Sequence, residues 1–181
     1  MSNILLSYSE QVDWMGIGTN VAGPLAAPRG GRPEHRVISI DNPMTQRHAT
    51  PRSWLLPSLL RVEAISSKAY YPHRLFETGE ITRMTEASDG CETSHHLAAL
   101  VAHAEARFSE LHAVLSALFH SLGISYQMVS ISHPTFIEGR SGLIICQDRE
   151  VGFIGEVHPK VLTHWAINMP AVAFELDILL L

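Results

Sequence analysis

The chain has 181 residues, of which 46% are hydrophobic and 17% are charged, and its formal net charge is -5 with neutral histidines. This composition is typical of a packed globular protein and excludes a disordered or fibrous one. The acidic balance argues against a broad phosphate-binding surface, and therefore against nucleic-acid binding by bulk charge.

The sequence predicts a protein that does not enter a membrane. Its N-terminus has no cationic segment followed by an apolar signal run, and no apolar stretch is long enough to span a bilayer. The two cysteines, Cys91 and Cys146, match no metal-ligand spacing, which favours reduced thiols inside a cell. We therefore expect a cytoplasmic location.

The first 36 residues are interpreted as a leader and a loop rich in glycine and proline, so the folded domain is expected at 37–181. Residues 3–9 of the leader are strand-like. Val37–Ile40 is a β-branched run that indicates a strand. A helix is predicted from Leu56 to Lys68, where apolar residues recur at helical spacing.

A strand is predicted at 73–81, and residues 87–94 are turn-like. The clearest helix is expected at 108–122, where seven apolar residues form one stripe and Gly123 takes the position of a C-terminal cap. Further strands are predicted at 125–131, 142–148, 150–157 and 171–180, with a short helix at 158–166. This order predicts an α+β fold in which helices flank an antiparallel β-sheet.

Several short strings follow one another in a recognisable order. They are NP at 42–43, RSWLLPSLL at 52–60, YPHRLFETGEI at 71–81, LGISYQ at 122–127, HPTFIEGRSG at 133–142, GFIGEVHPKVL at 152–162 and AFELD at 173–177. Together they resemble the β subunit of phenylalanyl-tRNA synthetase. The matched part is similar to the C-terminal catalytic-like core of that subunit, either free-standing or excised from a longer chain.

The resemblance implies the fold of class II aminoacyl-tRNA synthetases without their chemistry. In the family's catalytic α subunit, a related segment leads to a strand that ends Gly-x-Gly-x-Glu-Arg, where glycines admit ATP and the arginine holds its phosphates. Here Glu175, Leu176 and Asp177 occupy that strand. Two carboxylates would repel a triphosphate, so no catalytic residue is assigned.

A second class II signature, arginine and glutamate separated by one residue, is matched only loosely by Arg74 and Glu77. Because side chains alternate along a strand, the extra residue sends Arg74 to the other face. Arg140 is expected to form a structural ion pair with a carboxylate across the sheet. The candidate ligand or interface contacts are Arg52, Arg74, Glu77, Arg140, Glu156, His158 and Glu175.

The eleven histidines raise the question of a metal site. The five between His95 and His120 are interpreted as helical, but no two of them have the i, i+4 spacing that places imidazoles on one helix face. We therefore expect no metal ligand in this chain. The resemblance assigns ATP and magnesium to the family's complete enzyme, so no cofactor is expected on this chain alone.

The resemblance implies a noncatalytic assembly scaffold within a phenylalanine-tRNA ligase, with no autonomous activity. Its expected partner is a catalytic α-like subunit or a second copy of itself, with tRNA reached only through the complex. The helix at 56–68 is expected to contribute to that interface. The alternative is a free-standing paralogue whose cleft binds an amino acid or nucleotide, for which Arg52, Arg74 and Arg140 are the available cations.

Overall fold

A computed structural model describes residues 5–17, 37–45, 48–66, 68–84 and 90–181. The main element is a six-stranded, fully antiparallel sheet in the order β3-β4-β8-β7-β6-β5. Its strands are β3 (His73–Met84), β4 (Cys91–Ala102), β5 (Gln127–Ser130), β6 (Phe136–Cys146), β7 (Arg149–Val157) and β8 (Ala171–Asp177). The predicted α+β architecture, with helices flanking an antiparallel sheet, is confirmed.

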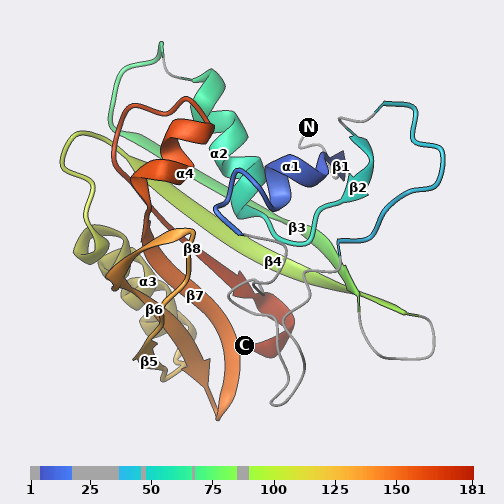
Figure 1. The fold of residues 1–181 in the computed structure, drawn as a ribbon. Coiled ribbons are helices and arrows are strands. Elements are labelled where there is room, and N and C mark those ends of the chain that lie inside the picture. The colour runs from blue at the N-terminus through green and yellow to red at the C-terminus, as the bar shows by residue number, and fades with distance from the viewer. Residues whose placement is uncertain (1–4, 18–36, 46–47, 67, 85–89) are drawn as a thin grey trace.

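Helices cover both faces of this sheet (Figure 1). They are α1 (Tyr8–Gln11), α2 (Leu56–Ile65), α3 (Phe108–Leu122) and α4 (Pro159–His164), followed at the C-terminus by a 3₁₀ turn, η2 (Ile178–Leu180). Two short strands, β1 (Leu5–Leu6) and β2 (Thr50–Pro51), pair outside the main sheet. No helix among the described residues has the length and apolarity needed to cross a membrane.

The core consists of two clusters on opposite faces of the sheet. Val12, Leu59 and Val161 bring the N-terminal segment, α2 and α4 onto one face, which we call the α2 face. Leu111 and Leu115 bring α3 onto the other, which we call the α3 face. Strand alternation divides β8 between the clusters: its alanines at 171 and 173 face α2, and the apolar side chains between and beyond them face α3.

Helix α3 has the predicted bounds, and Gly123 caps it in the left-handed conformation with φ 68°. Helix α2 ends at Ile65, short of the predicted Lys68. The strand predicted at Val37–Ile40 is wrong, because this short run pairs with no strand among the described residues, although the Ile40 N–H donates to the Ala49 carbonyl. The glycine- and proline-rich loop at 23–36 lies outside the described residues.

The prediction of a turn at 87–94 is wrong for residues 91–94, because β4 begins at Cys91. The first residues of β4 are polar on both faces, which hides the strand signal, yet β3 pairs with all of them. His95 and His96 therefore lie on a strand, and the helical interpretation of this region is wrong for them. Only His112 and His120 of the five histidines lie on a helix.

Candidate functional site

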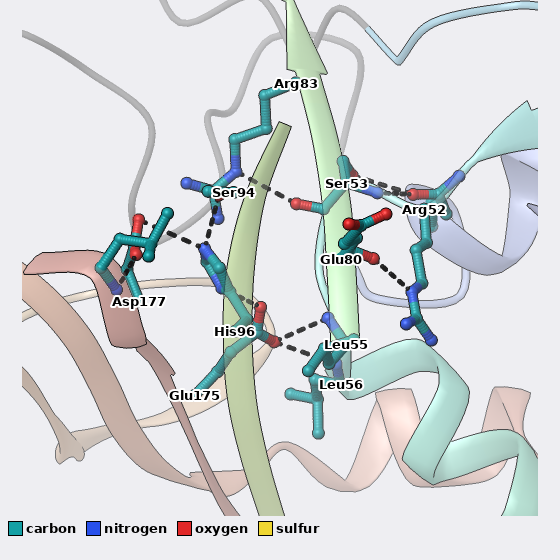
Figure 2. A network of polar contacts seen from close by, with 12 residues as sticks. Arg52, Ser53, Leu55, Leu56, Glu80, Arg83, Ser94, His96, Glu175 and Asp177 are labelled. Carbon is teal, nitrogen blue, oxygen red and sulfur yellow. Dashed lines mark hydrogen bonds and ion pairs between the residues drawn. The ribbon is translucent and has the colours of Figure 1, made fainter. Parts of the chain in front are cut away.

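Glu175, on β8, is fully buried and points toward the start of α2 (Figure 2). Its Oε2 accepts hydrogen bonds from the backbone N–H groups of Leu55 at 2.8 Å and Leu56 at 3.0 Å. The first N–H groups of a helix lack intrahelical partners and form the positive end of its dipole. Leu55 cannot cap the helix with its own side chain, so a carboxylate from the sheet does so.

His96 continues this network on the neighbouring strand β4 (Figure 2). Its Nδ1 lies 2.8 Å from Glu175 Oε1, and its Nε2 lies 3.0 Å from Ser94 Oγ and 3.6 Å from Asp177 Oδ2. The imidazole has no solvent exposure. A buried carboxylate is tolerated when its oxygens are hydrogen-bonded, and here both oxygens of Glu175 are occupied.

Arg83, near the C-terminal end of β3, brings a positive charge to the same network. Its Nε donates to the backbone oxygen of Ser53 at 3.1 Å. Burial lowers the pKa of the Arg83 guanidinium from its ordinary value, and the nearby carboxylates of Glu175 and Asp177 oppose that shift. The guanidinium therefore offsets part of the negative charge that the two carboxylates bring to the α2 face.

Arg52, a candidate ligand or interface contact, is buried against β3. Its side chain is 4% exposed, its Nε donates to the Glu80 carbonyl at 2.8 Å, and its guanidinium forms an ion pair with Glu77. A Cβ at Gly79 would lie 2.3 Å from Arg52 Nη2, so the missing side chain makes room for the guanidinium. The pair of Arg52 and Glu77 fastens the segment before α2 to the sheet.

Arg74 lies on the opposite face of β3 from Glu77. Its side chain is 68% exposed and contacts Glu110 of α3 at 3.4 Å. A hydrogen bond from His103, with help from Arg74, holds the pKa of the Glu110 carboxyl below its ordinary value despite some burial. The structure therefore does not bring Arg74 and Glu175 together on one face.

The ion pair predicted for Arg140 is present. Its Nη1 donates to Glu156 Oε2 at 2.7 Å, which raises the pKa of the guanidinium. The other oxygen of Glu156 accepts the backbone N–H of Phe108, the first residue of α3, at 2.8 Å. Glu156 thus accepts a backbone N–H at the start of α3, as Glu175 does at the start of α2. The two glutamates lie on opposite faces of the sheet.

His158, the last predicted contact, caps α4. Its Nδ1 accepts the backbone N–H of Lys160 at 3.1 Å, so it stabilises the junction between β7 and α4. Across the parts of the chain that the structure describes, no three His, Cys, Asp or Glu side chains gather as a metal site would require. The predicted residues therefore do not converge on one centre: they lie at three helix starts and on two faces of the sheet.

Sequence reasoning missed His96 and Arg83, which complete the environment of Glu175. A signal was available for His96. It precedes a run that alternates into the α2 face at Ala98, Leu100 and Ala102, so period 2 places the imidazole on that buried face. A histidine at a buried strand position needs a polar partner, and a carboxylate on an adjacent strand is a natural one.

Comparisons with known proteins identify the family of this chain. A family model described as the phenylalanyl tRNA synthetase beta chain CLM domain matches residues 10–178. The chain is 40% identical over 147 residues to a phenylalanine-tRNA ligase beta subunit of Thermococcus onnurineus, covering 81% of this chain and 26% of the relative.

Similar values hold for beta subunits of two other organisms. Identity is 39% over 145 residues for Pyrococcus horikoshii (80% of this chain, 26% of the relative) and 36% over 148 residues for Methanopyrus kandleri (81% and 25%). The chain spans about a quarter of the length of these relatives. It belongs to the family of the phenylalanyl tRNA synthetase beta chain CLM domain.

Proposed function

We propose that this chain is a noncatalytic module of a phenylalanine-tRNA ligase and that it acts by assembly with a catalytic α-like subunit. Its relatives are named beta subunits of that ligase, a name that implies an alpha subunit in the same complex. A class II synthetase-like fold is part of the proposal. The six-stranded antiparallel sheet with helices on both faces supports it.

The occupied carboxylate of Glu175 is the observation that carries the noncatalytic part. The sequence resemblance places the ATP-binding strand of the catalytic subunit at β8. Here the Glu175 oxygens already accept hydrogen bonds from the start of α2 and contact His96, and Asp177 adds a second carboxylate beside them. A triphosphate would meet buried negative charge. We therefore assign ATP and magnesium to the complete ligase and not to this chain.

The exposed end of α2 is the proposed assembly surface. Its first five residues are buried in the chain's own core, whereas Val62 and Ile65 are exposed, the latter at 78%. Tyr70, just beyond the helix, is fully exposed. Apolar side chains grouped in this way are typical of an interaction site. An α-like subunit would cover them, or a second copy when that subunit is absent, and tRNA would be reached only through the complex.

The test is association with the phenylalanine-tRNA ligase α subunit of the same organism, measured by analytical ultracentrifugation. We expect a complex with the unaltered chain and at least about 10-fold weaker association after Val62→Asp with Ile65→Asp, because charges would be buried at the contact. Val114→Asp, at an exposed position of α3, is the matched control and should leave association unchanged.

Three results would contradict the proposal. One is the absence of any complex, and another is equal weakening by the α3 control. The third is transfer of phenylalanine to tRNA by this chain alone. Calorimetric titration with phenylalanine and with ATP separates the alternative function, since saturable heat from either ligand would favour a cleft repurposed for small molecules.

A further inference from the structure

An open pocket of about 360 Å³ lies where β5, β6 and the start of α3 meet. Phe108 of α3 and Met128 of β5 contribute its apolar walls, and Ser130, Arg140 and Glu156 contribute polar groups. A few polar groups within a partly apolar hollow of this volume are typical of a small-molecule site.

The pocket lies on the opposite face of the sheet from the network in Figure 2. Phe153 of β7 is directly paired with Glu175 of β8, so these two side chains share the α2 face. Glu156 is three residues further along β7 and therefore points to the α3 face. The pocket is thus independent of the β8 position discussed above for ATP.

An irregularity in β6 aims Arg140 at this pocket. The stretch between Phe136 and Ser141 is longer than its counterpart on β7, which is Glu156 alone. Gly139 adopts a φ of 74° within this bulge, and open space lies above it. Bulges of this kind redirect a side chain out of the regular pleat. The guanidinium of Arg140 reaches the mouth of the pocket as a result.

The local charge favours an anion. Glu156 is the counter-charge for two positive groups, since one oxygen accepts the first N–H of α3 and the other accepts Arg140 Nη1. The helix dipole therefore offsets part of the charge of Glu156, so that this carboxylate cancels the charge of Arg140 only in part. The Arg140 side chain is 60% exposed. Its five N–H groups allow it to hold a second carboxylate in parallel hydrogen bonds while keeping the first.

The opposite wall suits an apolar body. Phe108 presents a partly buried ring that stacks on His112. Met128 extends over Gly142, where a Cβ would lie only 2.6 Å from its Cγ, so this glycine lets the thioether lie along the pocket. A methionine side chain adapts readily to the shape of an apolar ligand.

We propose that this pocket binds a small organic acid whose carboxylate pairs with Arg140 and whose apolar body lies against Phe108 and Met128. The proposal does not depend on assembly with an α-like subunit, so either can fail without the other.

The test uses 3-phenylpropionate as the probe and 3-phenylpropionamide as its neutral match, each titrated into the full chain and followed by the backbone amide signals of Ser130 and Gly142. The acid should produce saturating shifts and the neutral compound none. Arg140→Gln should weaken binding by about 10-fold or more, the range for a lost charge-assisted hydrogen bond. Arg149→Gln, an exposed cation at the start of β7, changes the net charge equally and should have no effect.

A second variant separates pocket occupation from the ion pair. Ser130→Phe places a ring in the pocket from an exposed strand position that tolerates aromatics, and it should block the probe while Arg140 and Glu156 stay intact. Equal shifts from acid and neutral compound would overturn the proposal. Equal loss in the Arg140 and Arg149 variants, unchanged binding in Ser130→Phe, or no saturation at tens of millimolar probe would overturn it as well.

Discussion

Glu175 is separated by 120 and 119 residues from the two N–H groups that it holds. Its carboxylate and the adjoining His96 are both fully buried. Removing the carboxylate would leave two backbone donors and an imidazole without their acceptor, in a place that water does not reach. Leaving such buried groups unpaired costs more free energy than the hydrogen bonds contribute to stability when they are formed.

We predict that Glu175→Ala lowers the free energy of unfolding by about 3 kcal/mol, in the range for a buried charge pair that loses one partner. Urea unfolding followed by circular dichroism measures the change. Glu80→Ala is the matched control, because its side chain is exposed and only its backbone oxygen bonds to Arg52. That variant should stay within about 0.5 kcal/mol. An equal loss of unfolding free energy in the two variants would mean that Glu175 does not anchor the start of α2.

The sequence pointed to Glu175 but not to its function in the fold. Its place in the last strand was evident from neighbouring motifs, whereas its hydrogen-bond partners come from α2 and β4. Glu77 pairs with Arg52, whereas Glu175 is fully buried and accepts hydrogen bonds from the start of α2. Contacts between elements so distant in the chain depend on sheet order, which local patterns do not specify.

At the scale of elements, the segment before α2 is fastened to β3 by one close fit. Arg52 crosses Gly79 to reach Glu77, and a Cβ at position 79 would displace the guanidinium from this position. The N–H of Thr82 also donates to the backbone oxygen of Arg52 at 2.9 Å. This segment therefore covers the outer edge of β3 over the last part of the strand, which limits unwanted pairing at that edge.

We predict that Gly79→Ala lowers the free energy of unfolding by about 2 kcal/mol, as expected when a packed site is overfilled. In an Arg52→Ala background the same change should cost less than about 0.5 kcal/mol, because the group it collides with is gone. A double-mutant cycle by urea unfolding gives both values. Additive effects would mean that contact with Arg52 is not the source of the cost at position 79.

Elements whose apolar residues recur at one clear spacing were predictable from the sequence. Elements that form only because a neighbouring strand pairs with them were not. The stripe from Phe108 to Leu122 fixed α3, and Gly123 marked its end. The polar start of β4 looks like a turn because its side chains meet little core, although its backbone is fully paired with β3. Val37–Ile40 fails for the converse reason: the residues suit a strand, but in the part of the chain that the structure describes no strand pairs with them.

At the scale of the whole molecule, residues 5–17 are part of the same core as the rest of the chain. Val12, Met15 and Ile17 are buried in the cluster of the α2 face. Gln11 is 1% exposed, and its amide bonds to Thr50 at 2.7 Å. Glu10 forms an ion pair with Arg61 of α2. These contacts hold the N-terminal segment against α2.

Burial raises the pKa of Glu10, but hydrogen bonds from Arg61 and Ser7 outweigh it and hold the pKa below the ordinary 4.5. A folded-state pKa that is lowered means that the unfolded chain binds the proton more tightly. The contribution of Glu10 to stability is therefore present above pH 4.5 and is lost as the pH falls through the lowered value.

We predict that Glu10→Gln reduces the loss of unfolding free energy at acidic pH. The reduction should be no more than about 1 kcal/mol, because the ion pair with Arg61 is partly exposed. Urea unfolding at a series of acidic pH values measures it, with Asp13→Asn at an exposed position as the control. An unchanged slope in Glu10→Gln would assign the acid dependence to other carboxylates.

The helix cap that β8 supplies also limits how this chain can change over evolution. A glycine at position 175, the first requirement for a nucleotide near the backbone, would remove the acceptor for the start of α2 and leave His96 without its partner. The intermediate would lose stability before it gained any ligand contact. Because natural proteins have only a few kcal/mol to spare, a nucleotide site along this strand would need compensating changes at α2 and β4 first.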